Sequence, residues 1–159
     1  MSSAWAFSWE GFLPLVERGQ HVMVVAPVFR ERPLMEAIWR RLRDGKGGVY
    51  LVGSREAPND GASYFLVFSY WGAGLYLVDP WPLKPEGSFV LVDGRRGVLG
   101  PQVAGLSDPD GKTRELSEEE VKVWWEYGRK LIAAGSEYRY DLKAQALLHV
   151  MRRLGLIRR

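Results

Sequence analysis

A strand–helix–strand pattern near the start of the chain constrains the fold more than any other feature. Residues 21–28 form a nearly continuous apolar run with four valines, which is typical of a strand covered on both faces. Pro33 suits the first turn of a helix that Gly45 can end, and residues 49–52 form a second apolar run. The pattern predicts an α/β unit with a right-handed crossover. The rest of the helix surface carries three arginines, Arg40, Arg41 and Arg43.

The following segments extend this unit into a mixed sheet. Residues 62–71 predict a helix because a further apolar strand follows closely at 75–79. Residues 88–99 predict a hairpin whose turn is Asp93-Gly94. The expected fold class is therefore α/β (α+β), with the three apolar runs as neighbouring strands of a mixed central sheet and the hairpin joined to them.

A change of period marks a boundary after the hairpin. The turn cluster 108–112 divides the chain into an α/β domain, residues 1–106, and a helical extension, residues 107–159, packed on it. Ser117 and Glu120 form a capping box that begins the first helix of the extension. Its apolar stripe includes Trp124 and Trp125, which we expect to pack in the core rather than stack on bases.

The last helix of the chain begins at Asp141 and ends at Gly155. Its predicted apolar side consists of Leu142, Ala146, Leu147, Val150 and Leu154. Its polar side consists of Gln145, His149, Arg152 and Arg153.

Composition narrows the classes of function. The chain has no Cys, which excludes disulfides, cysteine metal sites and a thiol nucleophile, and no motif predicts a metal or a cofactor. No apolar run is long enough for a membrane span and the start is not basic, so we expect a soluble cytoplasmic protein. Arg outnumbers Lys 16 to 6 and Asn59 is the only asparagine, which favours a thermophilic source.

The segment 85–101 carries a recognisable spacing. Asp93-Gly94 and Gly100 fall in the register of a signature with His, Lys, Asp-Gly and Gly-Ser at fixed intervals, and Glu86 and Ser88 occupy the His and Lys positions. In this respect the chain resembles the phospholipase D-like (HKD) superfamily. The likeness extends over residues 8–104, where helices and strands follow each other as in one half-domain of that family.

The resemblance implies a fold, an assembly and a loss of activity. Active relatives use the His as nucleophile and the Lys to hold phosphate, and they join two copies of the motif within a chain or across a homodimer. Glu86 would repel phosphate and Ser88 is neutral, so we expect a catalytically degenerate half-domain that forms a homodimer and acts as a nucleic-acid-binding or assembly module. The vestigial positions are Glu86, Ser88, Asp93 and Gly100.

Other catalytic residues and other functions stay open at this point. An active phosphodiesterase or nuclease could use non-standard residues around Glu86, Asp93 and Lys84. His21 is better explained as a hydrogen-bonded structural histidine, and His149 as a solvated one. Asp93 is as well explained by a turn as by an inherited role. A small α/β protein that binds only a protein partner is the third alternative.

Basic residues at the end of the chain suggest a partner. Residues 136–159 contain six cations and two acids, a balance of +4, so DNA or another polyanion can bind there. An ordinary solvated helix face is an equal alternative. The candidate nucleic-acid-binding residues are Arg139, Lys143, Arg152, Arg153, Arg158 and Arg159.

Overall fold

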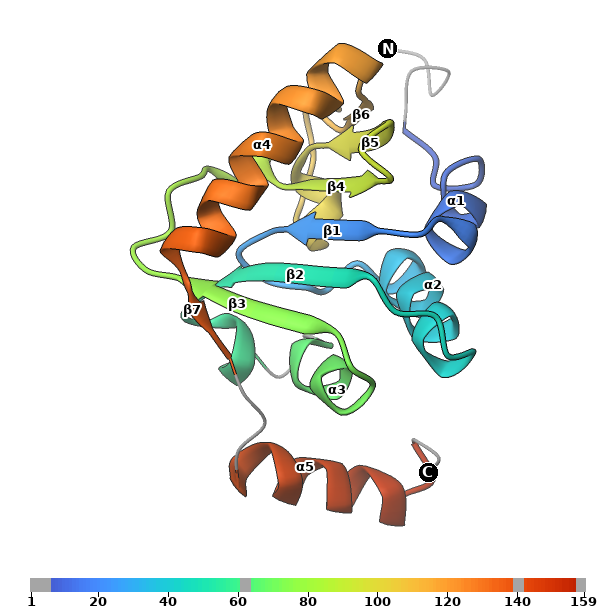
Figure 1. Ribbon diagram of the computed structural model, residues 1–159, viewed down its shortest axis with the longest axis vertical. Helices are drawn as coiled ribbons and strands as arrows, with labels where there is room; N and C mark the ends of the chain where they lie inside the picture. Colours follow the sequence, from blue (N-terminus) through green and yellow to red (C-terminus); the bar gives the residue numbers. More distant parts are fainter. Residues whose placement is uncertain (1–6, 61–63, 139–141, 157–159) are drawn as a thin grey trace.

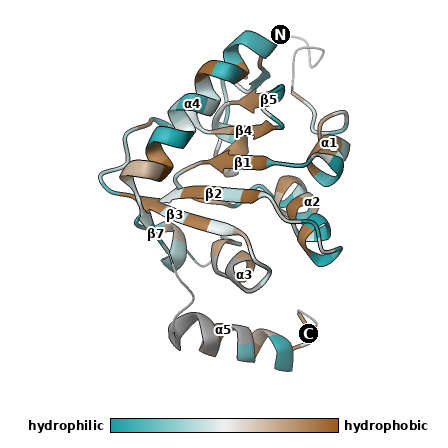
Figure 2. Cartoon of the chain, in the orientation of Figure 1, coloured by the Kyte–Doolittle hydropathy of each residue, from teal (hydrophilic) through white to brown (hydrophobic). Residues whose placement is uncertain are grey.

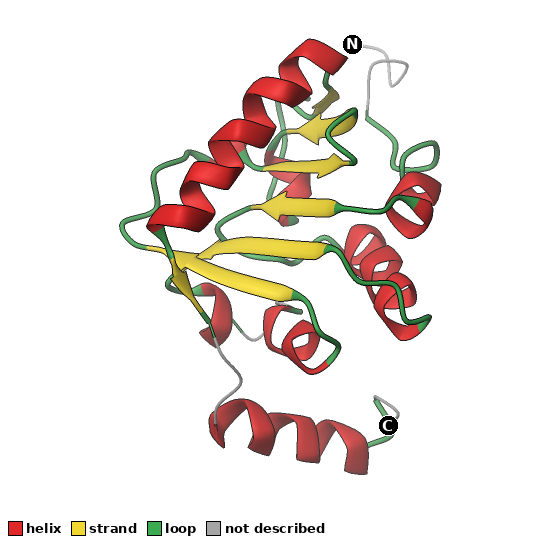
Figure 3. Cartoon of the chain, in the orientation of Figure 1, coloured by secondary structure: helices red, strands yellow, loops and turns green. Residues whose placement is uncertain are grey.

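The computed structural model describes residues 7–60, 64–138 and 142–156, which form one seven-stranded sheet with helices on both faces (Figures 1 and 3). The strands are β1 (Val22–Val25), β2 (Val49–Ser54), β3 (Gly74–Val78), β4 (Phe89–Val92), β5 (Arg96–Leu99), β6 (Arg114–Glu115) and β7 (Ser136–Glu137). The helices are α1 (Leu13–Arg18), α2 (Arg32–Arg43), α3 (Phe65–Tyr70), α4 (Glu118–Ala134) and α5 (Leu142–Arg153).

The order of the strands is β6-β5-β4-β1-β2-β3-β7. The central strands β1, β2 and β3 are parallel neighbours, and β4 pairs antiparallel with β1. The predicted mixed sheet, the neighbouring apolar runs and the attached hairpin are confirmed. The four residues of β1 and of β4 are all buried, as expected for strands covered on both faces.

Alternate residues of the sheet face two separate layers of helices. Val22 and Val24 pack with α1, α2 and α3 on one face, and Met23 and Val25 pack with α4 on the other. Figure 2 shows the apolar residues concentrated on the central strands, between these layers. On the second face α4 is the only helix among the described residues that packs on the sheet, together with Trp81, Leu83 and Leu116, and part of this face is left as a groove.

The extension after residue 106 supplies both edges of the sheet. β6 pairs with β5 and β7 pairs with β3, while α4 begins at the predicted capping box of Ser117 and Glu120. The division at residue 106 is a prediction that the pairing neither confirms nor excludes. No helix in the described ranges is long and apolar enough to cross a membrane.

Much of the predicted apolar side of α5 is exposed. Met151 packs towards Val67 on α3, whereas Leu147, Val150 and Leu154 are exposed. The sheet face nearest to α5 is already covered by α1, α2 and α3. In the described part of the chain, α5 contacts the rest of the fold through Met151, beside Val67, and leaves its other apolar side chains exposed.

Arg41 also departs from the expectation of a polar helix surface, since its side chain is only 2% exposed. Its guanidinium donates hydrogen bonds to the backbone carbonyls of Val16, Gly19, Gln20 and Gly47. Burial lowers the pKa of Arg41, and the nearby Asp93 carboxylate opposes that effect. The residue thus joins the end of α1, the start of β1 and the turn before β2.

Candidate functional site

The four motif positions lie at the two opposite ends of the hairpin strands β4 and β5, and therefore at opposite ends of the neighbouring strand β1. Asp93 and Gly94 lie in the turn after β4, beside the amino end of β1. Glu86 and Ser88 precede β4, and this places them beyond the carboxyl end of the antiparallel β1. Ligands of parallel sheets bind at the carboxyl ends of the strands, so only the second edge corresponds to a usual active site.

Asp93 binds backbone amides. Its Oδ1 accepts hydrogen bonds from the N–H groups of Gln20 and His21, each at 2.8 Å. Asp93 and Gly94 have φ angles of 56° and 65°, in the left-handed region that this kind of tight hairpin turn uses. These contacts support the turn explanation of Asp93.

Glu86 and Ser88 offer no basic nitrogen at the carboxyl edge. Glu86 forms an exposed ion pair with Lys112, with 3.7 Å between Oε2 and Nζ. Ser88 is fully buried, and its hydroxyl has no hydrogen-bond partner among the described residues. A phosphate at this edge would meet a carboxylate and a neutral, inaccessible hydroxyl.

Gly100, the last motif position, meets a steric requirement. Its φ is 147°, and a Cβ atom there would lie 2.3 Å from Cα of Thr113. Only glycine fits this approach of two backbone segments. Its N–H donates to the Ser88 carbonyl oxygen at 2.8 Å, which closes the base of the hairpin.

A polar hollow of about 540 Å³ lies at the carboxyl ends of β1, β2 and β3. It is lined by Val28, Arg30, Arg55, Glu56, Asn59, Asp60 and Asp79. Arg30 donates to both oxygens of Asp60, at 2.7 and 3.1 Å, and this interaction raises the pKa of Arg30. Arg55 lies 3.7 Å from Asp79. Two cations face three acids, so the hollow is not electropositive, and no acidic or histidine cluster in the described part of the chain could hold a metal ion.

Lys84, His21 and His149, the other residues considered for catalysis, lie in different parts of the fold. Lys84 is exposed just before Glu86 at the carboxyl edge, His21 lies at the amino end of β1, and His149 lies on α5. The His21 side chain is exposed and forms no hydrogen bond with a described residue, so the expected hydrogen-bonded structural histidine is wrong. The fold brings no pair of these residues together.

The basic residues of the C-terminal region are only partly described. Arg152 is half-buried and Arg153 is exposed in the last turn of α5. Lys143 lies on α5, where its side chain is not described, and Arg139, Arg158 and Arg159 lie outside the described residues.

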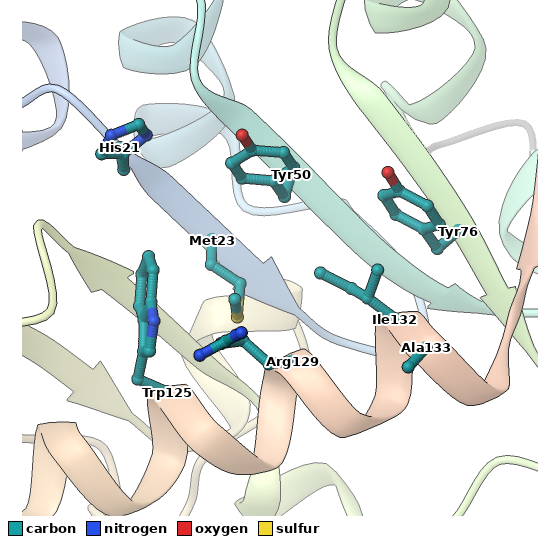
Figure 4. A pocket seen from close by; sticks show the side chains of 8 residues that line it. All are labelled: His21, Met23, Tyr50, Tyr76, Trp125, Arg129, Ile132 and Ala133. Atoms are coloured by element: carbon teal, nitrogen blue, oxygen red, sulfur yellow. The ribbon is translucent and has the colours of Figure 1, made fainter.

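A groove of about 460 Å³ between α4 and the sheet was missed by the sequence analysis (Figure 4). It is lined by His21, Met23, Tyr50, Tyr76, Trp125, Arg129, Ile132 and Ala133. Trp124 packs on Phe89 with 5.0 Å between ring centroids, as expected for a core residue, but Trp125 is half-exposed at the groove. Strand alternation places Tyr50 and Tyr76 on the α4 face, and this signal could have revealed the aromatic surface.

Comparisons with known proteins place this geometry in a fold family. Neither a family model nor a curated protein matches the sequence. Among solved structures, NucT from Helicobacter pylori is similar with a TM-score of 0.63 and 12% identity, over 81% of this chain and 89% of NucT. Nuc, a phospholipase D family member from Salmonella typhimurium, gives a TM-score of 0.62 and 15% identity, over 80% of this chain and 88% of Nuc.

A third similar structure is TrmBL2, an archaeal chromatin protein with a novel mode of DNA binding. Its TM-score is 0.52 at 14% identity, and the match covers 81% of this chain but 49% of TrmBL2. Two of the three structures are matched over almost their whole length. The chain therefore has a phospholipase D-like fold.

Proposed function

We propose that this protein is a nucleic-acid-binding module with a phospholipase D-like frame and no phospholipase D-type catalysis. The main observation behind the proposal is the identity of the residues near the carboxyl end of β1. The position of the family's nucleophile is a glutamate paired with Lys112, and the position of its phosphate-holding lysine is the fully buried Ser88. TrmBL2, which shares the fold, binds DNA, and this supports a nucleic-acid ligand.

Chemistry at that edge argues against turnover. Covalent phosphoryl transfer requires a nucleophile and a cation that offsets the charge developing on phosphate. The cation that pairs with a motif position is Lys112, and the Glu86 carboxylate 3.7 Å away would repel a phosphate bound beside it. The neighbouring hollow pairs its two arginines with Asp60 and Asp79.

Hydrolysis assays separate the proposal from the active phosphodiesterase alternative. We expect no cleavage of a generic phosphodiester by the wild type. Glu86→His should also be inactive, because it supplies the nucleophile without the lysine. Cleavage by the wild type that is lost in Asp93→Ala would instead establish an enzyme with non-standard residues.

Backbone phosphates are the expected contact for the basic end of the chain. Arginine pairs well with phosphate because its planar donors can engage two oxygens. Arg153 is the exposed arginine of the described part of this region, whereas Arg152 is half-buried and its replacement also affects packing. Contacts to backbone phosphates carry no sequence information, so binding through Arg153 should be insensitive to sequence.

The test is the salt dependence of affinity for duplex DNA. Arg153→Ala should weaken binding and reduce the slope of log affinity against log salt by about one unit. Lys46→Ala removes an exposed cation beyond the C-terminal region and is the matched control. If the wild type does not bind duplex DNA, or if Arg153→Ala matches the wild type at every salt concentration, the protein-partner alternative becomes the better explanation.

Self-association is the second function that a specific observation favours. Leu147, Val150, Leu154 and Leu156, in and just after α5, are between 37% and 68% exposed. A row of large apolar side chains on one helix is typical of an interface. We propose that α5 contributes to the homodimer.

A further inference from the structure

The groove between α4 and the sheet presents aromatic faces that the core does not use. Tyr50 lies opposite Gly74 in the β2–β3 ladder, and Tyr76 lies two residues further along β3. A Cβ atom at Gly74 would lie 3.3 Å from each of the two rings, so the missing side chain gives both tyrosines room to lie against the strand. Trp125 extends from α4 into the same groove, at the end where His21 lies (Figure 4). Together these partly buried rings line the groove.

The polar atoms of these walls are uncommitted. The hydroxyls of Tyr50 and Tyr76, the indole N–H of Trp125 and the imidazole of His21 form no hydrogen bond with a described residue. Arg129 is bonded to Glu126 at 3.2 Å, but both side chains are more than 60% exposed, and such a pair is weak. Its guanidinium can therefore turn to an anion in the groove.

The floor of the groove is formed by Met23 of β1 and is apolar. Met23 is 2% exposed, and its sulfur would lie 2.3 Å from a Cβ atom at Gly128, so α4 approaches β1 closely there. Ile132 and Ala133 continue the apolar wall beyond this point. The groove therefore has a rigid apolar floor, aromatic walls and polar groups along its rim. Its volume of about 460 Å³ lies within the range of small-ligand sites.

We infer that this groove binds an unpaired nucleotide, with the base against the aromatic rings and the phosphate near Arg129 and His21. Base stacking on aromatic side chains with a nearby cation is the usual chemistry of single-strand binding. A base within a duplex is stacked on its neighbours and cannot enter. The inference rests on the proposed nucleic-acid function for the choice of a strand as the source, while a free nucleotide has the same chemistry.

The experiment compares three ligands by calorimetry or anisotropy: a short thymidine strand, an abasic strand of equal length, and thymidine monophosphate. We expect the thymidine strand to bind more tightly than the abasic strand, which keeps the phosphates and lacks the bases. Tyr76→Ala should reduce affinity for the thymidine strand about 5- to 140-fold, the range for one stacked base, and leave affinity for the abasic strand unchanged. Tyr76→Phe keeps the ring and should retain most of the affinity.

A second pair of variants tests the groove without touching the sheet. Ala133 and Ala134 are exposed neighbours at the end of α4, and only Ala133 lines the groove. Ala133→Glu should weaken strand binding by filling the groove with an anionic side chain, and Ala134→Glu should bind like the wild type. Circular dichroism checks that all variants are folded.

The outcomes separate this inference from the proposed function. Equal affinity for the thymidine and abasic strands, or wild-type affinity in Tyr76→Ala and Ala133→Glu, would refute nucleotide binding in the groove, even where the protein still binds duplex DNA. Groove-dependent binding of thymidine monophosphate with no binding of any strand or duplex supports the site and overturns the nucleic-acid function. Binding of the thymidine strand that both groove variants reduce supports the site in its strand-binding form.

Discussion

Replacing Arg41 by methionine should destabilise the protein strongly, although the residue lies on a helix that the sequence describes as having a basic face. The guanidinium is buried and donates to four backbone carbonyls from three segments, at 2.7 to 3.2 Å for the bonds to Val16, Gln20 and Gly47. Methionine fills much of the same volume and supplies no donor. The substitution therefore removes the hydrogen bonds and the charge while leaving little empty space.

The magnitude follows from the burial of each acceptor. The bond to Val16 is buried, so leaving its carbonyl unpaired costs about 1–3 kcal/mol. The bonds to Gly19, Gln20 and Gly47 are partly buried, so water can replace the donor and each loss costs about 0.5–1.5 kcal/mol. Removing a buried charge recovers part of its desolvation cost, which leaves a net loss of about 2–4 kcal/mol.

Urea unfolding of Arg41→Met measures this loss, and Arg40→Met is the control on the neighbouring residue. Arg40 pairs with Glu17 at 3.1 Å, but the two side chains are 39% and 36% exposed, so its replacement should cost less than about 1 kcal/mol. A free energy of unfolding for Arg41→Met within about 1 kcal/mol of that of the control would show that the hydrogen bonds from Arg41 to the backbone carbonyls do not stabilise the fold as argued.

Three further predictions concern pH, the motif glycine and assembly. The hydrogen bond from Arg114, followed by that from the Ser117 amide, lowers the pKa of Glu120 from 4.5 to about 2. The Glu120 carboxylate therefore stabilises the fold above pH 4.5, and this stabilisation is lost as the pH falls towards 2. Glu120→Gln should remove this part of the acid dependence in thermal unfolding. Gly100→Ala should cost more than about 2 kcal/mol in urea unfolding, because its Cβ would overlap the Thr113 backbone, whereas Gly111→Ala, with φ of 62° and open space around it, should cost only the backbone strain of about 1–2 kcal/mol; equal costs would contradict the steric argument. Light scattering should show a dimer for the wild type and a monomer of 18.1 kDa for Leu154→Glu, and a monomeric wild type would contradict the α5 interface.

The central sheet could be predicted because continuous apolar runs in the sequence indicate which strands are buried. The apolar runs at 21–28 and 49–52 indicate strands buried on both faces, as in a sheet with helices on each side. The capping box at Ser117 and Glu120 is local, so it fixes the start of α4 without knowledge of the rest of the chain.

The features that escaped prediction depend on contacts between distant segments. Arg41 is buried because carbonyls from α1 and from the turn before β2 converge on it, and no helical pattern contains that information. The stripe of α5 is exposed because α3 offers a surface only to the side that carries Met151. The aromatic groove requires knowing that α4 leaves Tyr50 and Tyr76 partly uncovered.

Asp93 and Gly100, two motif positions that match the family spacing, each have a structural role in this fold. Asp93 accepts hydrogen bonds from two backbone amides of the segment before β1, and Gly100 permits close contact with the Thr113 backbone. Both residues would therefore be needed for folding even without catalysis. Glu86 is exposed and contributes only a surface ion pair, which is worth little to stability. The side chain at position 86 is therefore not constrained by the fold. For this reason the spacing around Asp93 indicates the fold, and evidence for function has to come from surfaces such as the aromatic groove and the basic end of α5.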